Sequence, residues 1–329
     1  MDEITIRPYE KGDERAINRA YNEIFNQHRS IEEWRWKFRP EQNASRIMIG
    51  LDGQNEVVSH FCAIFVNMQI DGRVLRLTQS LDAFCFDRPE LVRKKIFIKT
   101  AKRFYQEYCE GPGEIPFYYG TPGLKLLRLG KLALNFKGLM PIDYYYRETS
   151  RLIRPLGMLK GGSVWTALAS EADVSSGDID DLWERSSGRY PVTLEKNGAY
   201  FNFRFKQHPV NKYMFIPAFQ DNIISGLAVI SYGERVVKWV DLLWDGANPD
   251  TLSYLFESAW GVTRKSGAVK LEMWLNNDTE ASEVLVSHGM VEGENPYTFR
   301  LATCTFDDSL DADDIAQRFC FTMGDSDMF

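Results

Sequence analysis

A cluster of positive charges follows one apolar strand of the chain and points to the binding of an anion. The stretch QSLDAFCFDRPELVRKKIFIKTAKRFY, residues 79–105, reads as a strand that stops at Asp-Arg-Pro and continues as a helix. Arg93, Lys94 and Lys95, here called the basic triplet, stand near the start of that helix. A strand, a sharp turn and a helix N-terminus form a common phosphate-binding device, because free backbone N–H groups and the helix dipole attract anions. The pattern predicts a phosphorylated ligand, with a solvated helix face as the alternative.

Two aspartates interrupt strands that are otherwise apolar. Asp82 lies within the strand that precedes the basic triplet, and Asp241 lies within VKWVDLLWD in the second half of the chain. Each carboxylate either serves a reaction centre or is held in the fold by solvent or hydrogen bonds.

The cysteines and histidines do not indicate a metal site or a disulfide framework. The five cysteines are odd in number and scattered, without a C-x-x-C pair, and the four histidines share no metal-ligand spacing. Such usage is typical of reduced thiols. We therefore expect no bound metal and a cytoplasmic location.

Length and composition predict two globular domains. The chain has 329 residues, of which 44% are hydrophobic, enough to bury a full core. No apolar run approaches the roughly 18 residues of a membrane span, and the polar start MDEITIRPYE does not resemble a signal peptide. Of the net charge of −7, the last 24 residues carry seven aspartates against one arginine. The nearly neutral body makes nucleic acid an unexpected partner.

The first half reads as an α/β unit. We expect a strand at 4–8, a helix at 13–26, and a second helix at 30–40 that starts with a capping box formed by Ser30 and Glu33. Asp-Gly turns at 52–53 and 71–72 separate β-rich runs and predict an antiparallel meander. A long helix, a strand, a short helix and another strand then follow.

A similar order of elements recurs after RLIRPLGMLKGGS, residues 151–163, which we interpret as the domain boundary because it has a proline, three glycines and no clear period. Strand–DRPE–helix in the first half corresponds in this order to strand–ANPD–helix in the second, which indicates a weak internal repeat of one α/β unit.

This order of elements resembles the GNAT superfamily of acyl-CoA-dependent N-acyltransferases. In bacterial GNAT subfamilies one stretch reads as strand, His-Pro, aromatic, Arg-Gly-Lys-Gly and Ile-Phe, and a later one as Gly-Phe-Pro-Asn, a helix and Leu-Gly-Phe. The first pattern is matched here by Pro89, Ile96 and Phe97. The second is matched loosely by Gly120, Pro122, Asn135 and Phe136. The resemblance covers the first 150 residues, and in the second half it concerns element order alone.

The pyrophosphate-binding loop departs from the family. A GNAT loop needs glycines because ligand oxygens approach its backbone closely, whereas positions 92–95 here are Val-Arg-Lys-Lys. Either the basic triplet binds phosphate through its side chains, or the cofactor site is degenerate.

The resemblance also implies roles for individual residues. Asp82 would be the base that deprotonates the amine, and Tyr118 or Tyr119 would protonate the departing thiolate. The implied acyl-CoA-binding residues are Phe84, Arg93, Lys94, Lys95 and Ile96. Trp34 and Trp36 would line the acceptor side. Core packing is the alternative for the tryptophans, and an ordinary strand position is the alternative for the tyrosines.

The predicted fold class is α/β (α+β), with two tandem GNAT-like units, each a mixed, mostly antiparallel sheet flanked by helices. The expected division is 1–150, 151–305 and an acidic C-terminal tail at 306–329. The apolar residues of segment 318–323 predict that the tail docks on the body as a short strand or turn. Asp325 and Asp327 would then reach a polar cleft and bind the acceptor, unless the segment is only a hydrophobic anchor.

The expected function is acyl transfer from acetyl-CoA or another acyl-CoA to a small amine or amino sugar, by direct attack. A homodimer is compatible with this reading. Two alternatives stay open: a tandem-GNAT aminoacyl transferase that uses charged tRNA, and a catalytically degenerate GNAT-fold scaffold. The near-neutral body disfavours the first, because binding of tRNA usually needs a broad basic face.

Overall fold

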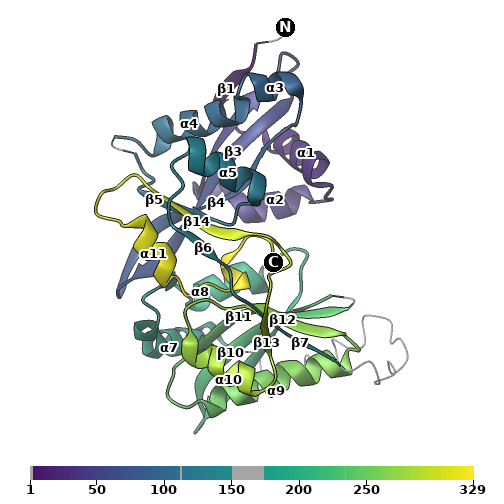
Figure 1. The fold of residues 1–329 in the computed structure, drawn as a ribbon, viewed down its shortest axis with the longest axis vertical. Coiled ribbons are helices and arrows are strands. Elements are labelled where there is room, and N and C mark those ends of the chain that lie inside the picture. The colour runs from purple at the N-terminus through teal and green to yellow at the C-terminus, as the bar shows by residue number, and fades with distance from the viewer. Residues whose placement is uncertain (1–2, 112, 150–173, 234) are drawn as a thin grey trace. The chain divides into compact units, whose positions relative to one another are not determined.

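The computed structural model describes residues 3–111, 113–149, 174–233 and 235–329. The chain forms two compact units (Figure 1). The first comprises residues 1–68, 75–141 and 298–317, and the second comprises 69–74, 142–297 and 318–329.

The first unit is a mixed sheet with helices on both faces. Its strands follow the order β1-β2-β3-β4-β5-β14-β6. Its elements are β1 (Thr5–Pro8), α1 (Glu14–Phe25), α2 (Ile31–Phe38), η1 (Pro40–Gln42), β2 (Ser45–Leu51), β3 (Val57–Ile70), β4 (Arg73–Cys85), α3 (Pro89–Arg93), α4 (Ile96–Tyr108), β5 (Phe117–Gly120), α5 (Leu124–Ala133), β6 (Leu139–Pro141), β14 (Arg300–Thr305) and most of α11 (Ala312–Arg318).

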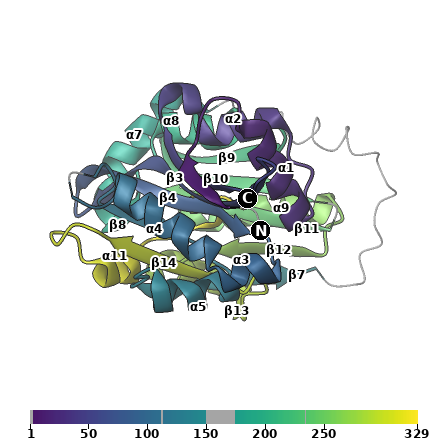
Figure 2. The same cartoon turned by 90° about the horizontal axis from the view of Figure 1, so that it is seen from above.

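Local sequence signals explain how these elements begin and turn. Ser30 and Glu33 form the predicted capping box at the start of α2. Asp71 and Gly72 both have positive φ, as the tight turn between β3 and β4 requires. Alternate residues of β2 face opposite ways: Ile47 and Ile49 pack with α1 and α2, while Met48 packs with α4 (Figure 2). The sheet is therefore buried on both faces.

The second unit repeats this plan. Its sheet has the order β13-β7-β12-β11-β10-β9, and α9 packs against β9, β10, β11 and β12. Its elements are β7 (Tyr144–Glu148), α7 (Ser176–Ser186), η2 (Ser187–Arg189), β8 (Val192–Leu194), α8 (Gly198–Phe201), η3 (Asn202–Lys206), β9 (Tyr213–Gln220), β10 (Ile223–Tyr232), β11 (Val236–Trp244), α9 (Asp250–Lys265), β12 (Lys270–Trp274), α10 (Thr279–Ser287), β13 (Val291–Gly293) and η4 (Met323–Asp325).

Each sheet contains one strand that comes from outside the main run of its own strands in the sequence. The order β2-β3-β4-β5-β14-β6 corresponds to β9-β10-β11-β12-β7-β13, with β14 antiparallel to β5 and β7 antiparallel to β12. The late strand β14 thus completes the first sheet, and the middle strand β7 completes the second. The predicted fold class, two tandem mixed α/β units, is confirmed.

The expected boundaries differ from the observed units in two places. The strand near 297–304 was assigned to the domain 151–305, but β14 hydrogen-bonds to β5 and β6 in the first unit. The stretch up to residue 150 was assigned to the first domain, but β7 pairs with β12 and β13 in the second. The periodicity of a sequence identifies a strand but not the strand with which it pairs. The placement of β14 in the first sheet and of β7 in the second was therefore not predicted. The predicted boundary segment, 151–163, lies outside the described residues.

No helix within the described parts of the chain is both long and apolar enough to cross a membrane.

Gly138 offers a test of how β14 is seated in the first sheet. A Cβ atom at this position would lie 2.1 Å from the Thr303 Oγ1 and 2.3 Å from the Ala312 carbonyl oxygen. We expect Gly138→Ala to lower the free energy of unfolding by about 1–3 kcal/mol, because both neighbours belong to packed elements. Urea unfolding measures this, with Gly188→Ala as the control, since no atom lies within 4 Å of a Cβ there. Equal stability of the two variants would contradict the placement of β14.

Candidate functional site at the diverging strands

In the first unit, β4 and β5 run in parallel for only a short distance. The ladder pairs Thr78 with Tyr118 and Gln79 with Tyr119. Gly120 marks the last close approach, because a Cβ there would lie 2.7 Å from the Ser80 carbonyl oxygen. β4 continues to Cys85, but in the described part of the chain its ladder with β5 has no pair after Gln79–Tyr119 (Figure 1 shows both strands). Two parallel strands that part in this way can receive a ligand between them.

A local irregularity in β4 lies just beyond the last pair. Asp82 has a φ of 47°, in the left-handed region that a residue with a side chain seldom adopts. The His60 Nδ1 lies 2.8 Å from the Asp82 carbonyl oxygen, and the Cys62 thiol donates to the Leu81 carbonyl oxygen at 3.0 Å. Side chains of β3 thus take part in bonding β4. Burial lowers the pKa of His60 to about 4, so its ring is neutral near pH 7.

The Asp82 carboxylate is buried between two cations. It accepts hydrogen bonds from Arg29 and, at 3.0 Å, from Lys37, and its side chain is 2% exposed. Burial alone would raise the pKa of Asp82, but Lys37 and Arg29 hold it well below its usual range. A carboxylate held in this way is a weak proton acceptor. The geometry favours a role in fixing the β4 irregularity over the predicted role as a base.

The two tyrosines predicted to act as acids point into the packed interior. Tyr118 shares a hydrogen bond with the Tyr105 hydroxyl, and burial raises its pKa well above the ordinary value. Tyr119 is also fully buried, next in β5. Tyr118 is therefore committed to the core between β5 and α4, together with Phe306.

The basic triplet occupies a break between two helices, not the first turn of one. Arg93 ends α3, and Lys95, with a φ of 55°, precedes α4. The backbone N–H groups of Leu91, Val92, Lys94 and Lys95 all donate to carbonyl oxygens within the turn 88–92. These amides cannot cradle a phosphate, so an anion would be bound by the side chains. Arg93 and Lys95 are exposed, and the triplet makes no ion pair within the described part of the chain.

The remaining predicted residues of the first unit are mostly core. Trp34 is fully buried and shares a hydrophobic cluster with Phe84, whose ring stacks on His60 at 5.1 Å. Ile96 packs against α3 and β3, and Trp36 is half-buried on α2. Trp34 and Ile96 therefore support the fold around the diverging strands and do not line an opening.

The second unit has a matching divergence that the C-terminal segment fills. β11 and β12 pair from Val236–Lys270 to Trp239–Met273. Beyond this, Thr322 forms a bridge with Leu275 and donates through its hydroxyl to Asp241 at 3.0 Å. Gly324 follows so closely that a Cβ there would lie 2.6 Å from the Asp241 carboxylate. Segment 321–325 therefore lies against both β11 and the chain that follows β12.

Where this segment meets β11, two buried carboxylates share one lysine. The Lys196 ammonium donates to Asp241 at 2.6 Å and to Asp325 at 3.3 Å, and the Tyr200 hydroxyl donates to Asp241 at 2.9 Å. Burial raises the pKa of Asp325 to about 6. The negative charge of Asp241 acts in the same direction, and the attraction of Lys196 acts against it. Asp325, predicted to bind an acceptor, is thus a buried internal contact, while Asp327 is half-buried nearby.

The cationic partners of the two aspartates were not predicted. Arg29, Lys37 and Lys196 lie in stretches where a charged residue normally faces solvent. The C-terminal residue has a further such partner, since Arg204 donates to the Phe329 carbonyl oxygen and to that of Ser326 at 2.6 Å. The signal that could have indicated these cations is the position of each aspartate in an apolar strand, because a buried carboxylate requires a cation nearby in the fold.

Solved structures share this architecture. A GCN5-related N-acetyltransferase from Anabaena variabilis superimposes with a TM-score of 0.63 at 8% identity, over 93% of this chain and 73% of that one. A second from Kribbella flavida gives 0.54 at 13%, over 92% and 71%. The N-myristoyltransferase of Saccharomyces cerevisiae, crystallised with myristoyl-CoA and inhibitors, gives 0.55 at 12%, over 99% and 86%. No protein-family model and no curated protein matches the sequence. At this identity the likeness establishes the fold: the chain has the GNAT fold, with two tandem units.

Replacing Asp82 separates a structural role from a catalytic one. Asp82→Asn removes the buried carboxylate that pairs with Arg29 and Lys37, so we expect a loss of about 3–5 kcal/mol in the free energy of unfolding. The control is Asp87→Asn, whose exposed ion pair with Lys125 should contribute less than about 1 kcal/mol. Urea unfolding measures both. A stable Asp82→Asn protein that has lost only turnover would restore Asp82 as the base.

Asp325 predicts how stability depends on pH. Its folded pKa, about 6, lies above its unfolded value of 3.8, so its contribution to stability is full below 3.8 and is lost as the pH rises through 6. Asn resembles the protonated form of Asp. The free energy of unfolding of Asp325→Asn should therefore rise relative to that of the wild type by roughly 1–3 kcal/mol between about pH 4 and 7. Unfolding in urea across that range gives the difference. A constant difference would show that Asp325 is already ionised at low pH.

Proposed function

We propose that the chain is an acyl-CoA-dependent N-acyltransferase that binds its cofactor in the first unit, where β4 and β5 diverge. The contrast between the two divergences supports this assignment most directly. In the second unit, segment 321–325 lies against β11 and the end of β12. We therefore place the cofactor arm at the first divergence, since the chain itself already lies in the second.

The shared fold supports the class of cofactor. One structure with this two-unit fold, the yeast N-myristoyltransferase, was crystallised with myristoyl-CoA. Acetyl-CoA or a longer acyl-CoA is accordingly the proposed donor for this chain, and the proposed acceptor is a small amine or amino sugar that attacks the thioester directly.

We assign the cofactor phosphates to the side chains of the basic triplet. The amides that a glycine-rich loop would offer are already bonded within the turn 88–92. Arg93 and Lys95 are exposed beside the end of β4 and have no acidic partner in the described residues, so a phosphate can compete only with water for them. Charge-assisted hydrogen bonds from such side chains are the strong ones in phosphate recognition.

In this proposal Asp82 is a positioning residue. Its pairs with Arg29 and Lys37 tie α2 and the chain before it to the irregular part of β4. The carbonyl groups of Leu81 and Asp82 are held by Cys62 and His60. The backbone of β4 is thereby fixed in direction at the point where an acyl group would lie.

A catalytically degenerate scaffold is the second candidate function. The bonded amides of the turn 88–92 favour it, because they remove the backbone contacts on which a GNAT pyrophosphate loop depends. A scaffold would bind no acyl-CoA at all, so affinity measurements distinguish the two.

Calorimetry with CoA, acetyl-CoA and myristoyl-CoA tests the assignment. The triple variant Arg93→Ala, Lys94→Ala, Lys95→Ala should bind at least about 30-fold more weakly than the wild type, because each charge-assisted hydrogen bond contributes about 1.5–3 kcal/mol. The matched control removes three exposed lysines elsewhere on the first unit, Lys11→Ala, Lys102→Ala and Lys131→Ala.

Three outcomes are distinguishable. Loss of affinity in the first variant but not in the control supports the proposal. Equal losses in both would mean that the charge effect is general and that the phosphates lie elsewhere. Absence of binding in the wild type would favour the scaffold.

A further inference from the structure

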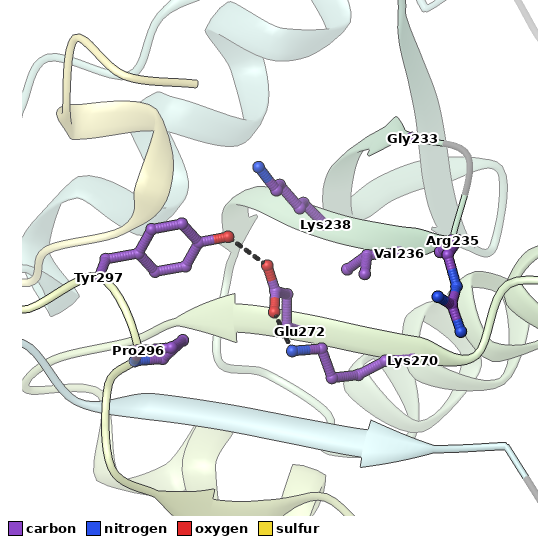
Figure 3. A pocket seen from close by; sticks show the side chains of 8 residues that line it. All are labelled: Gly233, Arg235, Val236, Lys238, Lys270, Glu272, Pro296 and Tyr297. Carbon is purple, nitrogen blue, oxygen red and sulfur yellow. Dashed lines mark hydrogen bonds and ion pairs between the residues drawn. The ribbon is translucent and has the colours of Figure 1, made fainter.

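The second unit has a pocket of about 480 Å³ on the paired part of β11 and β12, before the point where these strands diverge (Figure 3). It opens at the beginnings of β11 and β12 and is bounded on one side by Pro296 and Tyr297. This volume is in the range of small-molecule sites. Its lining is rich in positive charge: Arg235, Lys238 and Lys270 stand against one carboxylate, Glu272.

Glu272, the carboxylate among the described lining residues, already has its hydrogen bonds. Glu272 accepts from Lys270 at 2.6 Å, from the Tyr297 hydroxyl at 2.6 Å and from the Tyr144 hydroxyl at 2.9 Å. These donors hold the pKa of Glu272 below its usual value although burial would raise it. Glu272 is therefore ionised and holds Lys270 and Tyr297 in place. Its oxygens already accept three hydrogen bonds, which leaves little capacity to bind a cationic ligand.

Lys238 is different because it forms no ion pair with a described residue, although Glu272 attracts its charge from a longer distance. It is half-buried, and its ammonium lies 4.5 Å from the ring centroid of Phe329 and 5.6 Å from that of Tyr297. It makes no hydrogen bond or ion pair with a described residue, and burial lowers its pKa. Figure 3 shows its ammonium above Glu272 and beside Tyr297. A partly desolvated cation gains more from an anion than an exposed one does.

The rings beneath Lys238 are held firmly. Phe329 is the last residue of the chain, and Arg204 donates to its carbonyl oxygen. Its ring also packs edge-on against Trp274 at 4.9 Å and Tyr297 at 5.4 Å. The ammonium is thus supported on fixed aromatic surface, while Arg235 lies exposed at the other end of the lining without an acidic partner in the described residues.

We propose that this pocket binds a small molecule whose oxyanion, a carboxylate or a phosphate, pairs with Lys238, while Arg235 at the other end of the lining adds to the attraction for anions. Among the described lining residues, three cations stand against Glu272, which favours an anionic ligand over a cationic one. The ring of Tyr297, which lines the pocket, offers apolar contact to the rest of the ligand. The proposal concerns the second unit alone and does not depend on acyl-CoA binding in the first.

Two simple anions distinguish the possible ligand classes. Inorganic phosphate and succinate are titrated at constant ionic strength, and protection of Lys238 from amine acylation is followed by peptide mass spectrometry, with calorimetry for affinity. We expect at least one probe to protect Lys238 in a saturable manner. Saturation by phosphate alone assigns a phosphorylated ligand, and saturation by succinate alone assigns a carboxylate.

Variants show whether the binding belongs to this pocket. Lys238→Met keeps the apolar stem and should weaken the binding of the saturating probe at least about tenfold, as loss of a charge-assisted hydrogen bond does. Lys212→Met removes an exposed lysine from the same unit and should leave the affinity unchanged. Because Arg235 is exposed, Arg235→Ala gives the same test if Lys238→Met does not fold. Lack of saturation by both probes, or affinities that neither pocket variant changes, would overturn the proposal.

Discussion

Two parallel strands that diverge leave a wedge whose backbone groups need partners, and this constraint governs the structure. A buried N–H or C=O group without a hydrogen bond costs free energy comparable to a lost bond. In the second unit the chain meets that need itself, because segment 321–325 bridges Leu275 and reaches Asp241. In the first unit, side chains of β3 bond to β4 beyond its last pair with β5. The difference between the two wedges is the basis for assigning the cofactor to the first.

Buried ion pairs stand at both wedges and fix the strands in place. Asp82 is held by Arg29 and Lys37, while Asp241 is held by Lys196 and Tyr200. Removing one partner of such a pair is strongly destabilising because an uncompensated charge remains in the interior. The two units thus hold their diverging strands with ion pairs made by different residues. This is consistent with a repeat that keeps the fold but not the sequence.

The sequence carries enough information for the elements but not for their partners. The Ser30–Glu33 capping box and the Asp71–Gly72 turn are local signals, and the structure has both where they were predicted. The placement of β14 beside β5 depends on contacts between residues more than 180 positions apart, which no local pattern encodes. The basic triplet shows the same limit: its charge was evident, but the break at Lys95 divides the expected helix into α3 and α4. Asp82 was evident as an exception in its strand, yet its cations could be found only in three dimensions.

The central claim is that the first wedge takes the acyl-CoA and the second is filled by the chain's own C-terminal segment. A crystal structure of the protein with acetyl-CoA tests it most directly. The account predicts one cofactor between β4 and β5, with its phosphates against Arg93 and Lys95, and segment 321–325 unchanged beside Asp241. A cofactor between β11 and β12, with that segment displaced, would contradict the account.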